Sequence, residues 1–154
     1  MQSPIKVINE LLVGLFNEIL TIEKASLQAS PFNELSLTEM HVIEAIGMNS
    51  RTMTDVADQI GVTVGTLTTS INRLVKKGYV ERKRSEEDRR FVQIELTHKG
   101  RLAYRMHDAF HAQMVKYMIE ELSGEDNEVL IASLTRLSEF FKEKYHLTKN
   151  ATKE

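Results

Sequence analysis

The chain of 154 residues has no cysteine, which excludes disulfide bonds, thiolate catalysis and metal sites built from cysteine. The longest apolar run, from Leu11 to Phe16, is far shorter than the roughly 20 residues that cross a membrane. Proline occurs only at positions 4 and 31, and no glycine- or serine-rich linker divides the chain. The first residues lack the basic and apolar segments of a cleavable signal. We therefore expect one cytoplasmic domain that does not enter a membrane.

Charge is distributed unevenly along the chain. The net charge is only −2, yet the segment from Asn72 to Arg105 carries eleven basic and five acidic side chains. The rest of the chain carries nine basic and 17 acidic side chains. Such a local basic block suits a phosphate-binding surface, because electrostatic steering depends on the local potential. The alternative interpretation is a charged face that only contacts solvent.

Apolar residues recur with helical spacing over most of the sequence. The first helix is apolar around much of its circumference, so it needs cover from more than one side, and a partner subunit is one source of that cover. Threonine or serine followed three residues later by aspartate predicts helix starts after Thr52 and Ser123, and Thr63 and Thr97 are further N-caps. The expected helices span residues 4–27, 38–47, 53–60, 64–77, 98–122 and 124–147.

The hydrophobic period changes after Gly78. Residues 79–82 and 91–96 predict two short strands, joined by the polar turn 84–88. Two short helices separated at Gly61 and followed at once by a basic hairpin are typical of a winged helix-turn-helix. The sequence therefore predicts a mainly α fold with six helices and a small β-hairpin wing.

The helix that follows Thr63 occupies the place of the reading helix, whose N-terminal part enters the major groove of DNA. Its expected buried stripe consists of Val64, Leu67, Ile71, Leu74 and Val75. The outward positions are the predicted DNA contacts: Thr63, Gly65, Thr66, Thr68, Thr69, Asn72 and Arg73. A threonine hydroxyl bonds either base edge, and its methyl group packs on the thymine methyl. The alternative is that these threonines only face solvent, although they are poor helix formers.

The hairpin contains the triplet Asp88-Arg89-Arg90. An arginine at a wing tip can enter the minor groove, where narrow A·T-rich tracts concentrate negative potential. Asp88 is placed to hold Arg90 through a bidentate pair. We therefore predict that Arg84, Asp88, Arg89 and Arg90 belong to the DNA-binding surface.

Residues 52–100 resemble the MarR family of winged-helix regulators, most specifically in the D-R-R triplet and in the L-T-x-K-G turn of residues 96–100. The resemblance covers nearly the whole chain, so we expect a single domain over residues 1–154. It implies a homodimer built from residues 1–30 and 98–147, and a lobe of residues 36–97 that binds palindromic double-stranded DNA. It also implies that Arg90 enters the minor groove, held by Asp88.

The segments LSLTEMHVIEAIG, VGTLTTSINRL and GRLAYRMHDAFHAQMV look like the branch of this family that represses type II fatty acid synthesis genes. That likeness implies an A·T-rich operator and no cofactor. It implies an effector, a long-chain acyl group on acyl carrier protein, that strengthens DNA binding. Side chains available for an acyl pocket are Leu12, Leu15, Phe16, Ile19, Met40, His41, Ile43, Met106, His107, Phe110 and Met114. Basic candidates for the acidic carrier protein are Arg73, Lys76, Lys77, Arg101 and Arg105. The alternative is that the apolar residues are plain core.

A zinc-responsive repressor of the same family is the second hypothesis. His107 and His111 are four residues apart, so they share one helix face. With Glu23 and His41 they match positions at which zinc repressors of the family bind their metal, and four such ligands suit Zn²⁺. The histidine-rich run of zinc sensors is missing, however, and a polar pocket of hydrogen-bonded histidines is the alternative. The sequence therefore favours no metal.

An enzyme is not expected. His107-Asp108-Ala109-Phe110-His111 differs from the H-E-x-x-H motif of zinc proteases, and no glycine-rich phosphate loop is present. A dimeric adaptor without DNA binding is the remaining alternative. Such an adaptor would tolerate substitution of Arg90 or Thr68 by alanine, whereas a repressor would not.

Overall fold

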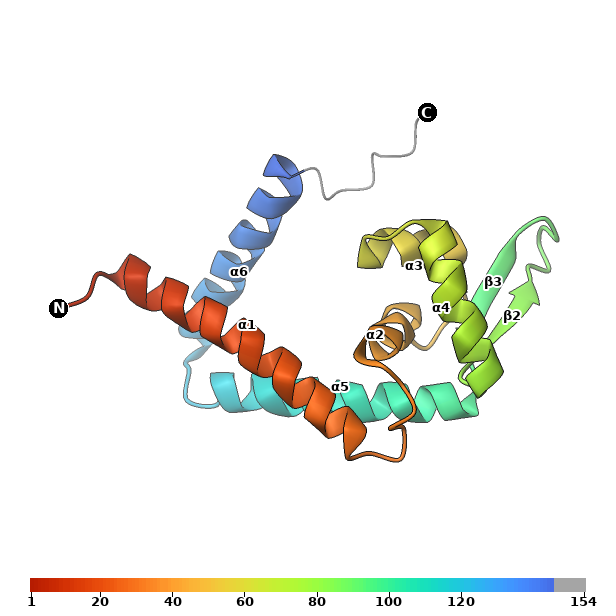
Figure 1. Ribbon diagram of the computed structural model, residues 1–154. Helices are drawn as coiled ribbons and strands as arrows, with labels where there is room; N and C mark the ends of the chain where they lie inside the picture. The colour runs from red at the N-terminus through yellow and green to blue at the C-terminus, as the bar shows by residue number, and fades with distance from the viewer. Residues whose placement is uncertain (146–154) are drawn as a thin grey trace.

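The computed structural model describes residues 1–145 (Figure 1). Within this part the chain forms six helices and three short strands. Their bounds are α1 (Pro4–Gln28), α2 (Leu37–Ile46), β1 (Arg51–Thr52), α3 (Met53–Ile60), α4 (Val64–Lys77), β2 (Val80–Arg84), β3 (Val92–Leu96), α5 (His98–Ile119) and α6 (Gly124–Lys144). The mainly helical fold is therefore the one that the sequence predicts. Residues 146 and 147, expected in the last helix, lie outside the described residues.

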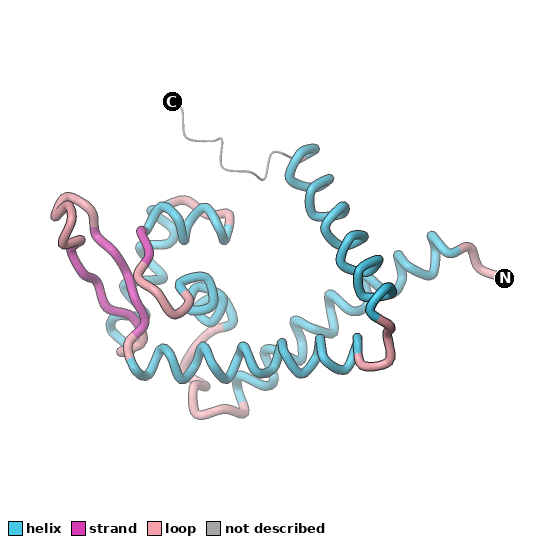
Figure 2. Tube along the Cα trace, turned by 180° about the vertical axis from the view of Figure 1, so that it is seen from behind, coloured by secondary structure: helices cyan, strands magenta, loops and turns pink. Residues whose placement is uncertain are grey.

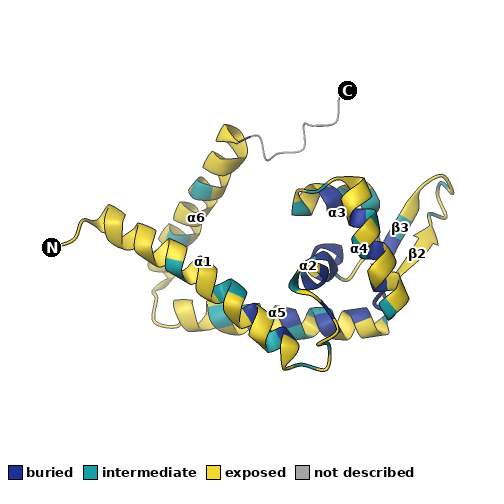
Figure 3. Cartoon of the chain, in the orientation of Figure 1, coloured by how far each residue is buried: buried dark blue, intermediate teal, exposed yellow. Residues whose placement is uncertain are grey.

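The chain divides into a lobe and a helical frame. The lobe consists of α2, α3, α4 and the strands, whereas α1 and α5 cross beneath it and α6 stands apart (Figures 1 and 2). Helix α2 lies at the centre of the lobe and contributes six buried side chains (Figure 3). Helix α5 packs against α2 and β3 and so joins the lobe to the frame.

The predicted capping residues set the helix-turn-helix geometry. Thr63 Oγ1 accepts a hydrogen bond from the backbone N–H of Thr66 at 3.1 Å, which starts α4. Gly61 and Gly78 have φ angles of +71° and +86°, a left-handed conformation that ends α3 and α4. The short turn between α3 and α4 therefore follows from local sequence.

The predicted hairpin is present but belongs to a three-stranded sheet. β2 and β3 are antiparallel, and Arg84 lies opposite Val92. On the other side of β3, β1 pairs Arg51 with Ile94. Two residues are too short to show an alternating pattern, so β1 could not be predicted. It ties the start of α3 to the wing.

The buried stripe of α4 is narrower than predicted. Leu67, Ile71 and Leu74 are buried, but Val64 and Val75 have exposed fractions of 43% and 37%. Val64 is the first residue of the helix, and Val75 is turned by roughly 100° from its buried neighbour Leu74. The prediction that these two valines are buried is therefore wrong.

The helical frame exposes large apolar faces. Helix α1 presents Phe16 with an exposed fraction of 64%, and α6 presents Val129 with 66%. In the described chain no residue of α6 is buried (Figure 3). Contiguous apolar surface of this kind is typical of a surface that another molecule covers. None of the described helices is long and apolar enough to span a bilayer.

Candidate nucleic-acid interface

The exposed side of α4 carries the residues predicted to read DNA. Thr68 is partly buried. The other predicted contacts are exposed: Thr63, Gly65, Thr66, Thr69, Asn72 and Arg73. The Thr68 hydroxyl donates to the carbonyl of Val64 at 2.8 Å. A hydroxyl that donates to its own helix keeps oxygen lone pairs that can accept hydrogen bonds from a base. The face thus offers acceptors and methyl groups to a base edge.

Gly65 lies in the first turn of this face. A Cβ atom at Gly65 would meet nothing nearer than the Thr63 hydroxyl, at 3.9 Å. Packing inside the protein therefore does not require glycine here. Glycine in a helix interior costs up to about 1 kcal/mol relative to alanine, and the role of Gly65 in a close approach to DNA stays a prediction.

Strand β2 divides the basic block between its two faces, because alternate side chains of a strand point to opposite sides. Arg82 and Arg84 share the face toward α4, and the Arg82 guanidinium donates to the side-chain oxygen of Asn72. Sequence reasoning did not include Arg82 in the site. Arg82 lies two residues before Arg84, so the alternation of a strand places both side chains on one face, and this spacing could have identified Arg82 from the sequence.

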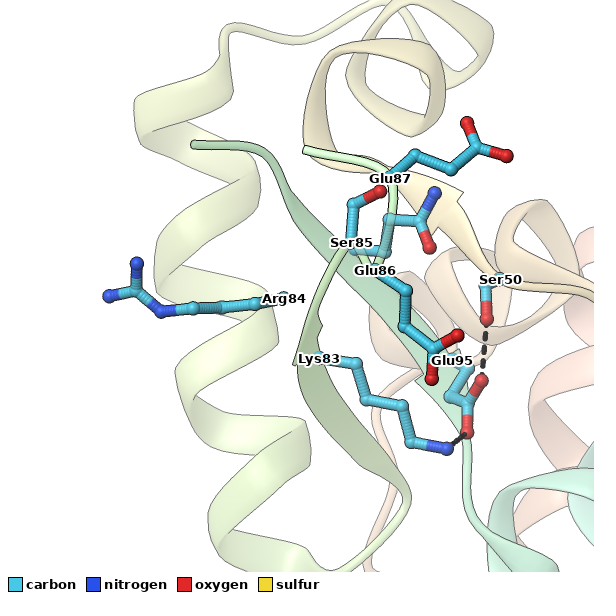
Figure 4. Close-up of a pocket in the computed structure, with 8 residues that line it drawn as sticks. Ser50, Lys83, Arg84, Ser85, Glu86, Glu87 and Glu95 are labelled. Atoms are coloured by element: carbon cyan, nitrogen blue, oxygen red, sulfur yellow. Dashed lines mark hydrogen bonds and ion pairs between the residues drawn. The ribbon is translucent and has the colours of Figure 1, made fainter. Parts of the chain in front are cut away.

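The opposite face of the wing is acidic. Glu81, Lys83 and Glu95 form ion pairs there, with 3.5 Å between Lys83 Nζ and Glu81 Oε1. Figure 4 shows Lys83 directed to Glu95 and Ser50, near Glu86, whereas Arg84 points the other way. Lys83, followed by the Ser50 hydroxyl, lowers the pKa of the Glu95 carboxyl to about 2. The Lys83 charge is thus neutralised within the protein.

The wing tip holds the predicted pair of Asp88 and Arg90. The Nε and Nη2 atoms of Arg90 donate to the Asp88 carboxylate, at distances from 2.6 to 3.1 Å. The Arg90 side chain holds the pKa of the Asp88 carboxyl below its usual value. A guanidinium has five N–H donors, so the Arg90 side chain, 85% exposed, keeps others free. Arg84 extends this tip through a 3.2 Å hydrogen bond to the Arg89 carbonyl.

A second cluster lies between α1, α2 and α5. The Glu23 side chain is 3% exposed, and its carboxylate lies 2.7 Å from His111 Nε2 and 3.3 Å from His41 Nε2. The structure therefore brings together the four residues of the metal hypothesis, which also include His107. The ligand atoms of Glu23, His107 and His111 all lie within 4.8 Å of one another.

Glu44 joins this cluster and was missed in the sequence. Its carboxylate lies 3.1 Å from His107 Nε2, which is also 2.9 Å from His111 Nε2. Burial lowers the pKa of His107, while the carboxylates of Glu44 and Glu23 oppose that shift. Glu44 lies three residues after His41, so the two share one face of α2, and this spacing could have identified Glu44 from the sequence. The arrangement serves either a metal ion or a self-contained hydrogen-bond network.

The residues predicted to line an acyl pocket fall into three groups. Met40 and Ile43 are fully buried in the lobe core. His41 and His107 belong to the histidine cluster. The others lie on α1 and α5 at positions from partly buried to exposed: Leu12, Leu15, Phe16, Ile19, Met106, Phe110 and Met114. A cavity formed by all three groups stays a prediction.

Comparison with known proteins agrees with this geometry. The family model described as MarR family matches residues 34–90. The HTH-type transcriptional regulator YfiV of Bacillus subtilis is 30% identical over 107 residues, which cover 68% of this chain and 66% of that protein. The chain thus spans about two thirds of the length of this relative.

Two solved structures with bound DNA have the same fold. FabT of Streptococcus pneumoniae in complex with DNA has a TM-score of 0.81 and 45% identity, covering 90% of this chain and 97% of that one. The MepR–DNA complex of S. aureus has a TM-score of 0.71 and 20% identity, covering 90% and 99%. At 20% identity, the similarity to MepR shows a shared fold only. With the helix-turn-helix, the wing and these similarities, the chain belongs to the MarR family and is a transcriptional regulator of that type.

Proposed function

We propose that the chain is a homodimeric repressor of fatty acid synthesis genes that binds an A·T-rich palindromic operator. Long-chain acyl groups on acyl carrier protein act as the corepressor. The observation that carries the proposal is the 45% identity to FabT over 90% of the chain. The exposed face of α4 and the Arg90 side chain fixed by Asp88 supply the two parts that read DNA.

The dimer part of the proposal follows from the uncovered apolar surface. Ile5, Ile8 and Phe16 on α1 have exposed fractions of 82%, 57% and 64%. Phe140 and Phe141 on α6 are exposed by 49% and 43%. A second copy of the same chain covers both faces in one symmetric contact. In this dimer the partner subunit packs on the apolar face of α1 that its own chain leaves exposed, which is the arrangement that the sequence predicts.

The effector acts by favouring one spacing of the two reading helices. An acyl chain among α1, α2 and α5 contacts the helices that join the lobe to the frame. Its effect on DNA affinity cannot exceed its differential affinity for the two spacings. Methionine side chains at positions 106 and 114 suit such a pocket, because they adapt to an irregular apolar ligand.

Fluorescence anisotropy tests the proposal on an A·T-rich palindromic fragment from a fatty acid synthesis promoter, at fixed salt. Long-chain acyl carrier protein is expected to raise DNA affinity about 5- to 100-fold, the usual range of allosteric coupling. The unacylated carrier is the control and is expected to leave the affinity unchanged. An equal effect of both forms, or of neither, would remove the lipid effector.

Substitution of Arg90 by alanine is expected to weaken operator binding by about 1–3 kcal/mol, because it removes the cation of the wing tip from the minor groove. The loss should be larger on sites with A·T-rich flanks. The matched control is Lys83→Ala, whose charge is already neutralised on the opposite face of the wing. If R90A binds in anisotropy titrations as tightly as the parent, the wing does not read DNA.

Zinc regulation is the second candidate, and the histidine cluster favours it. Carboxylate and imidazole are donors that Zn²⁺ accepts. The ligand atoms of Glu23, His107 and His111 lie close enough together to hold one ion, whereas His41 groups with Glu44 and His107. Calorimetry after EDTA treatment measures zinc binding directly, and anisotropy then measures its effect on DNA affinity. Micromolar binding that is lost in His111→Ala supports this candidate, and absence of heat removes it.

A further inference from the structure

The C-terminal end of the reading helix α4 meets the first turn of α5 (Figure 1). Residues from the loop before α2, from α2, from the end of α4 and from the start of α5 converge there, and we call this group the α4–α5 junction. Its members are Glu34, Glu39, Lys77, Tyr79, Thr97, Lys99 and Gly100. From the sequence, Lys77 and Lys99 were counted in the basic block. Their surroundings indicate a different role.

Lys77, the last residue of α4, has every donor of its ammonium group engaged. Its Nζ lies 3.0 and 2.8 Å from the two carboxylate oxygens of Glu39 and 2.8 Å from the backbone carbonyl of Glu34. An ammonium group has three N–H donors and no more. Glu39 is buried in α2, so the bonds fasten the end of α4 to the centre of the lobe. No donor of Lys77 is left for a phosphate.

Lys99, in the first turn of α5, is 45% exposed but is held by two hydrogen bonds and one ring contact. Its Nζ lies 2.6 Å from the Glu34 carboxylate and 3.2 Å from the Lys77 carbonyl. It also lies 4.4 Å from the ring centre of Tyr79, a favourable cation–π contact. The Tyr79 hydroxyl donates to the same Glu34 carboxylate at 2.7 Å. Burial raises the pKa of Tyr79, which keeps this donor protonated.

The backbone completes the junction. Thr97, the N-cap of α5, donates its hydroxyl to the Gly78 carbonyl at 2.6 Å and its N–H to the Tyr79 carbonyl at 3.0 Å. Gly100 follows in the first turn, where a Cβ atom would lie 2.1 Å from that same Tyr79 carbonyl oxygen. The start of α5 therefore packs directly on the backbone that leaves α4.

We propose that Lys77 and Lys99 are positioning residues that fix the end of the reading helix α4, Lys77 against α2 and Lys99 against α5, and that they do not bind DNA phosphates. This inference rests on the proposed binding of DNA by a dimer. Because α5 joins the lobe to the dimer frame, the angle between α4 and α5 sets where each reading helix points. The junction thereby determines whether both helices reach their half-sites together.

The salt dependence of DNA affinity separates positioning from phosphate contact. Lys77→Met is expected to weaken operator binding about tenfold and to leave the slope of log K against log salt unchanged. The comparison variant is Arg73→Ala on the exposed face of α4, which should lower that slope by about 1. A slope reduced by K77M as much as by R73A would show a phosphate contact and overturn the inference.

Exchange of the two charges gives a rescue test. Lys77→Glu alone places an acid beside Glu39 and is expected to weaken binding by more than tenfold. The double variant Glu39→Lys with Lys77→Glu restores the ion pair in reverse and is expected to regain most of the affinity. A phosphate-binding lysine would not be rescued in this way, because residue 39 is buried in α2.

A distance measurement that needs no DNA completes the test. The chain lacks cysteine, so cysteines introduced at the exposed positions Thr69 on α4 and Gln113 on α5 accept spin labels selectively. Labelled protein diluted into an excess of unlabelled protein reports the distance within one chain. We expect a narrow distribution in the parent and in Lys76→Met, and a broader or shifted one in K77M and Lys99→Met.

An unchanged distribution in both K77M and K99M would overturn the inference, whatever the DNA results are. If the parent binds no operator, the proposed function fails, while the distance measurement still decides whether the junction positions α4. The two failures are therefore distinguishable.

Discussion

Substitution of Gly100 by alanine is expected to lower the free energy of unfolding by about 3 kcal/mol, at the upper end of the cost of overpacking. The added methyl group would lie 2.1 Å from the Tyr79 carbonyl oxygen and 3.1 Å from Leu96 Cβ. The Tyr79 carbonyl already accepts the Thr97 N–H, so it cannot move without breaking that hydrogen bond. The first turn of α5 must therefore shift.

Urea denaturation measures this effect, with Gly65→Ala as the matched control. A Cβ atom at Gly65 has its nearest neighbour at 3.9 Å, in ordinary contact. The control should keep the stability of the parent or gain up to about 1 kcal/mol from helix propensity. A G100A variant as stable as the parent would contradict the close packing of α5 on Tyr79.

Local signals in the sequence predicted much of the fold. The N-caps at Thr52, Thr63 and Thr97 and the glycines that end α3 and α4 act on neighbouring residues, so spacing alone reveals them. The pair of Asp88 and Arg90 is also local, because the two residues are separated by one position in a tight turn. These contacts need no knowledge of the rest of the chain.

Contacts between distant segments could not be predicted. The partners of Lys77 are 38 and 43 residues away, and Lys99 meets Glu34 across 65 residues. A count of charges therefore assigned these lysines to the basic surface, although their ammonium groups bond to carboxylates and carbonyls of the protein itself. The two-residue strand β1 was missed for the same reason, since it exists only through its pairing with β3.

The histidine cluster lies between these two cases. The spacing of His107 and His111 on one helix face is a local signal, and the structure places both beside Glu23 as the metal hypothesis requires. The added carboxylate of Glu44 comes from α2 and depends on how that helix packs against α5. The distances thus fit a set of metal ligands. A zinc-binding measurement decides between a bound metal ion and a network of hydrogen bonds.

Insertion of half a helical turn between the two half-sites of the operator is expected to weaken binding about 100-fold or more. A symmetric dimer presents its reading helices on one side of the duplex, one DNA turn or roughly 34 Å apart. About five added base pairs rotate one half-site to the far side, so only one helix can read bases. The complex then loses half of its specific contacts and approaches non-specific affinity.

Anisotropy titrations at fixed salt compare three duplexes: the palindrome, the palindrome with the half-turn insertion, and a duplex of equal length with one half-site only. The proposed dimer predicts that the inserted duplex binds no better than the single half-site. The same titration with R90A should weaken all three. Equal affinity of the palindrome and the inserted duplex would contradict paired reading by two α4 helices, and with it the central claim about this protein.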